Sequence, residues 1–223
     1  MRPIHGLSAL LLALFLLGAV VKSQNGTRPV VSLTPLSSEQ LAVYRAVLAS
    51  WTGNEMLDVN LADRTVPLDE TSPFHDEECG KGLELEPASP KLVHRIRAED
   101  LSQLGSARIR LVETERGHKE VRENDPENTM RKGGSVDDAV KNGFAHGLFT
   151  LSEIRFDKMH KHAVVSYGFV CGGLCGNGAT VILVKGKDGW TLTKDRCSQW
   201  ISREAPSDLA PLQPITKQLV AGS

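Results

Sequence analysis

The clearest hydrophobic pattern in the chain spans residues 37–52, "SSEQLAVYRAVLASWT". Its large apolar side chains recur three or four positions apart, which predicts a helix with one buried face made of Leu41, Tyr44, Val47, Leu48 and Trp51. Ser37 is expected to cap this helix, with Gln40 as the second member of a capping box. Gly53 is expected to end it.

A different pattern follows at residues 56–63, where apolar and polar positions alternate and Leu57, Val59 and Leu61 fall on one side. Alternation of this kind predicts a β-strand, because successive side chains of a strand point to opposite faces. Residues 91–100 and 107–113 are shorter apolar stretches, and we expect them to form short strands or turns.

The middle of the chain has weaker patterns. Residues 66–91 contain four prolines and are expected to be irregular. Residues 113–134 are charged and contain three glycines and a proline, so we interpret them as an exposed loop. Residues 135–147 are expected to form a short helix, with Ser135 as its cap and Asp138 in its first turn.

The C-terminal third contains four strand-like segments in succession, at residues 151–157, 162–170, 179–186 and 190–202. Short connections favour antiparallel neighbours, so these segments predict a β-meander. We therefore predict an α+β fold in which the N-terminal helix packs on an antiparallel meander formed mainly by the C-terminal third. The helix face should meet the apolar side of the second and third segments, namely Val165, Tyr167, Val181 and Leu183.

Composition agrees with a single folded domain. The chain has 223 residues, of which 40% are hydrophobic and 24% charged, and its formal net charge is −1. That length is enough for one domain with a substantial core. Without a basic excess, nucleic acid is not an expected partner.

The N-terminus predicts export. Arg2 precedes an apolar run from Leu7 to Val21 that is shorter than the roughly 20 residues of a typical membrane helix. We expect cleavage after Ser23, so that the mature protein begins at Gln24 and is secreted or periplasmic, without a membrane anchor; retention of the segment as an anchor is the alternative. The expected organisation is a signal peptide, a flexible segment, one α+β domain and a disordered tail, at residues 1–23, 24–34, 35–202 and 203–223.

Export changes the interpretation of the four cysteines, because an even number in an oxidising compartment favours disulfides. Cys171 and Cys175 lie in "CGGLCGNG", where Gly172, Gly173, Leu174, Gly176 and Gly178 make up most of the remaining residues. We predict that a structural disulfide joins Cys171 to Cys175 across a glycine-rich loop, since glycines allow the backbone angles of a tight turn. Cys79 is then expected to pair with Cys197, and a pairing of Cys171 or Cys175 with Cys197 is the rival.

Residues 148–202 also carry a resemblance. The residues that carry the resemblance are Cys171, Gly172, Leu174, Cys175 and Gly176 in the loop, the pair Gly189-Trp190, and the ending Trp200-Ile201-Ser202. With these residues, the segment resembles a group of exported bacterial proteins of unassigned activity. This resemblance covers about a quarter of the chain and implies no reaction and no ligand residues. The order of elements, a helix followed by a long meander, is also similar to cystatin-like and nuclear-transport-factor-like domains.

Candidate chemistry is sparse. A thioredoxin-like site needs a Cys-x-x-Cys motif at a helix N-terminus, whereas this chain has a wider spacing between strands. Histidines and acids gather in "HDEEC" at residues 75–79, and His160 and His162 lie two apart, but neither group has the spacing of a known zinc site. We interpret His146 as a packing or turn residue. The sequence shows neither a G-x-S-x-G elbow nor a phosphate-binding loop.

Two hypotheses follow. In the first, the protein is a non-catalytic exported domain that binds an unidentified protein, glycan or small ligand, is stabilised by disulfides and needs no cofactor. In the second, it is a thiol–disulfide or metal-binding protein that uses Cys171 and Cys175.

Overall fold

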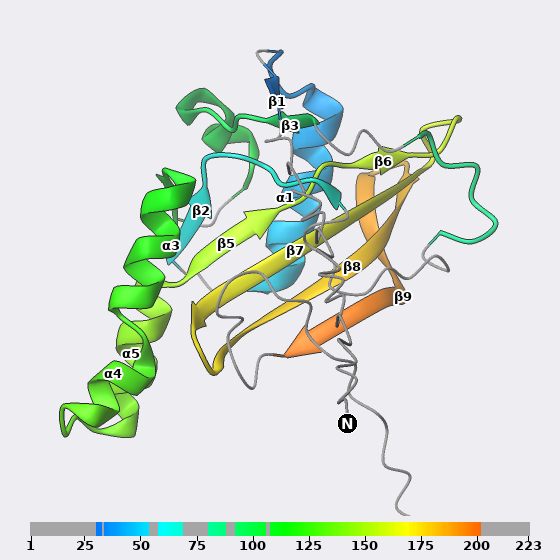
Figure 1. Ribbon diagram of the computed structural model, residues 1–223. Coiled ribbons are helices and arrows are strands. Elements are labelled where there is room, and N and C mark those ends of the chain that lie inside the picture. Colours follow the sequence, from blue (N-terminus) through cyan, green and yellow to red (C-terminus); the bar gives the residue numbers. More distant parts are fainter. Residues whose placement is uncertain are drawn as a thin grey trace, which may run out of the picture.

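The computed structural model describes residues 30–32, 34–53, 58–68, 80–87, 92–105 and 108–201. A seven-stranded sheet forms its centre, with strand order β4-β2-β5-β7-β8-β9 and β6 paired to β7 (Figure 1). The strands are β1 (Val30–Ser32), β2 (Asp58–Ala62), β3 (Leu92–His94), β4 (Arg108–Val112), β5 (Leu148–Leu151), β6 (Arg155–Phe156), β7 (His162–Gly172), β8 (Cys175–Gly186) and β9 (Gly189–Ile201). The helices are α1 (Ser38–Thr52), α3 (Thr114–Glu123), α4 (Pro126–Arg131), α5 (Val136–His146) and the 3-10 helix η1 (Ala98–Gln103).

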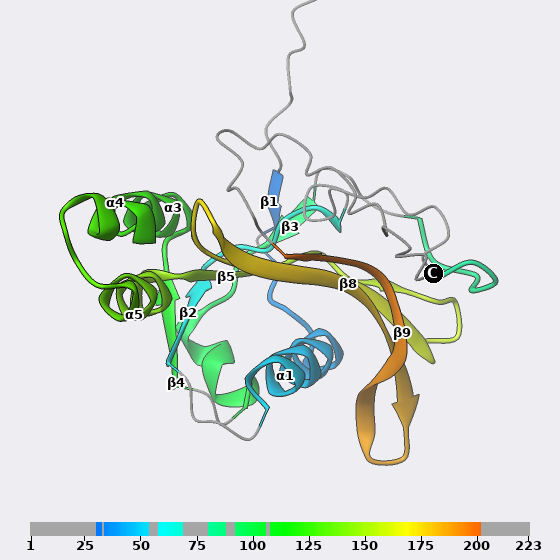
Figure 2. The same cartoon turned by 90° about the horizontal axis from the view of Figure 1, so that it is seen from below.

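The predicted α+β class and C-terminal meander are confirmed. Strands β7, β8 and β9 are consecutive antiparallel neighbours, with Val165 opposite Val181 and Leu183 opposite Leu192. They are also the longest strands, with 11, 12 and 13 residues. Figure 2 shows the meander as a curved sheet with α1 on its concave side. Register shifts between Thr180 and Leu183 accompany this curvature, as expected of bulges.

The other half of the sheet is parallel, which the sequence analysis did not predict. Strand β2 pairs in parallel with both β4 and β5, and β5 then pairs antiparallel with β7. Parallel strands need long connections: β3 and η1 lie between β2 and β4 in the chain, and the helices α3, α4 and α5 connect β4 to β5 on the other side of β2. A separate parallel pair joins β1 to β3, so Val30–Ser32 form a strand inside the segment that was expected to be flexible.

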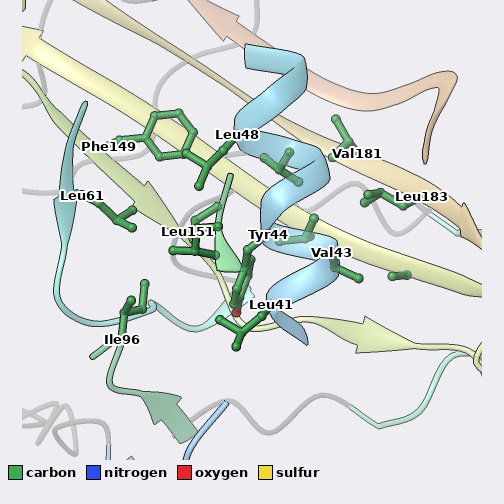
Figure 3. Packing of buried hydrophobic residues seen from close by; sticks show 14 of the residues in the cluster. Leu41, Val43, Tyr44, Leu48, Leu61, Ile96, Phe149, Leu151, Val181 and Leu183 are labelled. Carbon is green, nitrogen blue, oxygen red and sulfur yellow. The ribbon is translucent and has the colours of Figure 1, made fainter. Parts of the chain in front are cut away.

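The core between α1 and the sheet agrees with the predicted helix face. Ser37 and Gln40 form the capping box, and Gly53 is the C-cap. Tyr44, Val47 and Leu48 are at most 1% exposed, and they share one cluster with Val165, Val181 and Leu183 (Figure 3). The Tyr44 hydroxyl donates a hydrogen bond of 2.9 Å to the Ser152 carbonyl oxygen, so the one polar atom of this buried ring has a partner.

The prediction of an exposed loop at residues 113–134 is wrong, because α3 and α4 occupy most of this segment. Glu113 and Asp125 cap the two helices with their carboxylates, and Pro126 stands at the first position of α4. On the face of the sheet opposite α1, Val121 packs with Leu148 in a second cluster. A charged segment of this kind becomes helical because a few small and apolar residues meet the sheet.

The predicted strand at residues 151–157 is also corrected. Strand β5 begins earlier, at Leu148, and ends at Leu151, while β6 contains only Arg155 and Phe156. The Ser152 side chain accepts a hydrogen bond from the Ser166 backbone N–H, so the chain leaves regular pairing at this point. Residues 91–100 also hold more than a strand, because η1 begins at Ala98.

Several expectations concern residues outside the described ranges. These are the signal peptide at 1–23, the tail at 203–223, Cys79 and the acidic segment at 75–79. Across the residues that the structure describes, no helix combines the length and the apolar character needed to cross a bilayer.

Candidate functional site

The turn between β7 and β8 carries the disulfide that the sequence predicted. Cys171 and Cys175 are bonded, with their Cα atoms 5.0 Å apart, and each belongs to one of the two strands. Gly172 lies opposite Cys175 and has a φ of 144°, which side chains rarely allow. The bond therefore closes the end of a β-hairpin, and neither cysteine lies in a helix.

The glycines after the disulfide serve another purpose than the one predicted. Gly176 and Gly178 are within β8 and have no positive φ; their missing side chains leave room for the Trp200 ring. A Cβ atom on Gly178 would lie 2.4 Å from Trp200 Nε1 and 2.5 Å from the Tyr167 carbonyl oxygen. The motif "CGNG" and the C-terminal tryptophan thus form one packing unit rather than a flexible loop.

The disulfide turn also packs against the start of α4. The Gly173 N–H donates a hydrogen bond of 2.6 Å to Asp125 Oδ2. A Cβ atom on Gly172 would lie 2.4 Å from Pro126 Cδ, and one on Gly143 would lie 3.0 Å from the Cys171 carbonyl oxygen. This contact was missed because residues 113–134 were interpreted as a loop, although "NDPEN" carries the pattern of a capped helix start.

Exposure differs sharply within the turn. Cys171 is 1% exposed, whereas Leu174, which is at the tip, is 61% exposed. One half of the disulfide is therefore shielded from solvent, while the only residue between the cysteines with a large side chain faces solvent. The turn presents an apolar side chain on a frame that the disulfide and the Asp125 hydrogen bond hold in place.

The second predicted disulfide is only partly visible. Cys197 is disulfide-bonded, while its predicted partner Cys79 lies outside the described residues. Because Cys171 and Cys175 bond to each other, the rival pairing of either one with Cys197 is excluded in this structure. The Cys79–Cys197 bond remains a prediction.

A polar cluster that the sequence analysis did not predict lies where three parallel strands end. Because β2, β4 and β5 run in the same direction, the residues that follow them meet at one edge of the sheet. His94 Nδ1 lies 2.8 Å from Glu153 Oε2, and the His94 backbone N–H donates to Glu153 Oε1 at 2.8 Å. The Thr65 hydroxyl donates to the same carboxylate. Asp63 accepts from both the N–H and the hydroxyl of Thr114.

The His94–Glu153 pair resembles the orienting half of a catalytic triad, in which a carboxylate holds an imidazole by Nδ1. A nucleophile would have to reach Nε2 of that imidazole. The nearby Thr65 hydroxyl instead contacts Glu153 and also accepts from the His94 N–H at 2.7 Å. The cluster therefore fastens the end of β3 to the ends of β2 and β5, and its groups act as structural ties.

The two histidines of "HKH" are not directed to a shared ligand. His160 Nδ1 lies 2.8 Å from Glu39 Oε2, whereas His162 Nδ1 lies 3.0 Å from Asp157 Oδ2. Within the described part of the chain, no group of three or more His, Cys, Asp or Glu side chains is placed to hold a metal ion. The remaining candidate, His146, ends α5 with a buried Nδ1 that has no hydrogen-bond partner in the described structure.

His160 connects the turn before β7 to the first turn of α1. Its φ of 49° is unusual for a residue with a side chain, and its ring stacks on Phe156. The hydrogen bond to Glu39, helped by Glu86 at 3.7 Å, raises the pKa of His160 above its usual 6.5. Lys185 also donates to Glu39, at 2.5 Å. The protonated imidazole thus stabilises the attachment of α1.

This geometry predicts a pH dependence of stability. Because the folded pKa of His160 is raised, its contribution is fully present below about pH 6.5 and is lost as the pH rises through the folded pKa. The side chain is 44% exposed, so solvent screening limits the contribution to below about 1 kcal/mol. The variant His160→Asn keeps a residue that tolerates positive φ. In urea unfolding, it should reduce the difference in the free energy of unfolding between pH 5.5 and pH 8.5 by the contribution of His160. Glu39→Gln should remove the same part, and an unchanged pH difference in both variants would contradict the assignment.

Comparisons with known proteins identify no relative: no family model, no curated protein and no solved structure matches this chain. The fold and the turn therefore define an α+β domain with a disulfide-closed hairpin, and the resemblance to exported bacterial proteins remains a prediction.

Proposed function

We propose that this protein is an exported, non-catalytic binding domain that recognises a protein partner through the tip of its disulfide-closed β7–β8 turn. The observation that carries the proposal is the exposed Leu174 on a turn fixed by the Cys171–Cys175 bond and by Asp125. A preformed apolar contact is favourable for binding, because little conformational entropy is lost when a partner covers it.

Export is supported by the sequence alone, through the apolar run at Leu7–Val21. The alternative, thiol–disulfide or metal chemistry at Cys171 and Cys175, has less support. A reactive cysteine is partly exposed and lies in an electropositive setting, often at a helix N-terminus. Cys171 is buried in a strand.

Site-specific photo-crosslinking tests the binding role. A photoreactive amino acid replaces Leu174 in one variant and Asp188 in a control, since Asp188 is exposed in the turn at the opposite end of β8. After irradiation in the compartment that receives the protein, the 174 variant should give one discrete adduct that the 188 variant does not give. Opening the turn with Cys171→Ser and Cys175→Ser should reduce the adduct. The absence of an adduct, or identical adducts at both positions, would refute the proposal.

A thiol assay distinguishes the proposed structural disulfide from a redox-active one. If the disulfide is structural, the native protein should stay unlabelled by a maleimide at mild dithiothreitol concentrations and become labelled only after unfolding. Ready reduction and reoxidation of the native protein, with turnover in an insulin-reduction assay, would support the redox function instead.

A further inference from the structure

Helix α5 has an exposed row of apolar side chains that the proposed function does not use. Val136 is 62% exposed, Val140 49% and Phe144 53%. Residues four apart lie on one side of a helix, so the three side chains form a line along α5. Ala139 and Gly143, each one position before a member of the row, are buried, so the side of α5 next to the row packs against the rest of the molecule.

The position of α5 leaves this row accessible. Figures 1 and 2 show α4 and α5 together at one end of the molecule, away from α1 and from the β8–β9 hairpin. The row begins near the α4–α5 turn at Val136 and reaches the sheet at Phe144, whose ring lies 5.4 Å from that of Phe169. A helix that lies alongside α5 would therefore contact all three side chains.

We propose that the α5 row binds α5 of a second copy of this chain, in an antiparallel, two-fold symmetric pair centred on Val140. In that arrangement each Val136 faces Phe144 of the other copy, and the two Val140 side chains meet on the axis. A small side chain thus stands opposite a large one at both ends, which suits the close packing of two helices. The row is complementary to itself.

Charge favours the same arrangement. Asp137 and Lys141 flank the row on one side, and no ion pair joins either of them to another residue in the described structure. When two copies of α5 pack antiparallel about Val140, Asp137 of each copy lies beside Lys141 of the other. Opposite charges therefore meet twice, whereas a parallel pair would place like charges together. This charge complementarity favours a second copy of the chain, and not an unrelated protein, as the partner of the row.

The interface is small, so the association is expected to be weak. Stable complexes bury roughly 800 Å² on each partner, and three side chains on one helix supply only part of that area. We expect a dissociation constant on the order of 100 μM, which is relevant where the protein is concentrated. The pairing is separate from the proposed role of the Leu174 turn, and either one stands or fails without the other.

Sedimentation equilibrium of the mature protein with its disulfides intact, between 5 and 500 μM and at low salt, should show a monomer–dimer equilibrium. Val140→Asp places two carboxylates against each other on the axis and should weaken the dimer at least about tenfold. Ala145→Asp is the matched control, because Ala145 is exposed on the same helix but outside the row, and it should leave the equilibrium within about twofold.

A charge exchange tests the antiparallel geometry. Asp137→Lys or Lys141→Asp alone should weaken the dimer about 3–10-fold, since each brings like charges together twice. The double variant restores opposite charges and should return the dissociation constant of the dimer to within about twofold of the wild-type value. Circular dichroism and the melting temperature establish that each variant is folded. The proposal would be overturned if the wild-type protein stays monomeric at 500 μM, or if the double variant dimerises no more tightly than the single variants.

Discussion

Leu48→Ala should lower the free energy of unfolding by about 2–5 kcal/mol. The Leu48 side chain is 1% exposed and lies in the main cluster with Phe149 and Val181 (Figure 3). The loss has two parts. The substitution removes apolar groups whose burial stabilises the folded state, and it creates a cavity because the well-packed neighbours cannot fully close the space.

Urea unfolding measured by circular dichroism gives the value directly, with Ser50→Ala as the control. Ser50 belongs to the same helix but is exposed, so its replacement should change the stability by less than about 0.5 kcal/mol. A near-neutral effect of Leu48→Ala would mean that α1 does not hold the sheet through this face.

Gly178→Ala should be comparably destabilising, by about 2–3 kcal/mol, although it adds a single methyl group. The new Cβ atom would lie 2.4 Å from Trp200 Nε1 and 2.5 Å from the Tyr167 carbonyl oxygen, and real Cβ atoms do not approach other atoms so closely. Moving Trp200 removes only the first conflict, because the second involves the backbone of the neighbouring strand.

Gly186→Ala is the matched control within the same strand. Its Cβ would meet its nearest neighbour, the Gly189 carbonyl oxygen, at an ordinary 3.7 Å, and Gly186 has no positive φ. A glycine at such a position loses more chain entropy on folding than alanine, so the change should be neutral or stabilise by up to about 1 kcal/mol. Thermal unfolding of both variants distinguishes crowding at Gly178 from a general intolerance of β8 to substitution, which equal losses would indicate.

Helices in different parts of the chain differ in how far local signals in the sequence determine them. Helix α1 was predicted to within one residue at its start, because its cap, its apolar face and its terminal glycine are all local signals. Helices α3 and α4 were missed, although Glu113 and Asp125 cap them. The few positions that stabilise α3, such as Gly117 against Leu148, have meaning only when the sheet is present.

The disulfide turn shows the same division. Two cysteines four positions apart, between two strand-like segments, were enough to predict the Cys171–Cys175 bond, because the distance that a disulfide requires is a local matter. The hydrogen bond from Gly173 to Asp125 joins residues 48 positions apart, and no local pattern indicates it. The same is true of Trp200, whose ring explains two glycines that had been attributed to turn geometry.

The sequence by itself determined the elements whose signals lie within a few residues of each other: α1, α5, the meander β7–β9 and one disulfide. Capping, periodicity and short connections act over such distances, so they can be recognised without a fold. Only the tertiary structure decided the parallel order of β4, β2 and β5, the tie between His94 and Glu153, and the exposure of the α5 row. These depend on which distant segments come together, and that choice is made by the burial of the whole apolar surface rather than by any single segment.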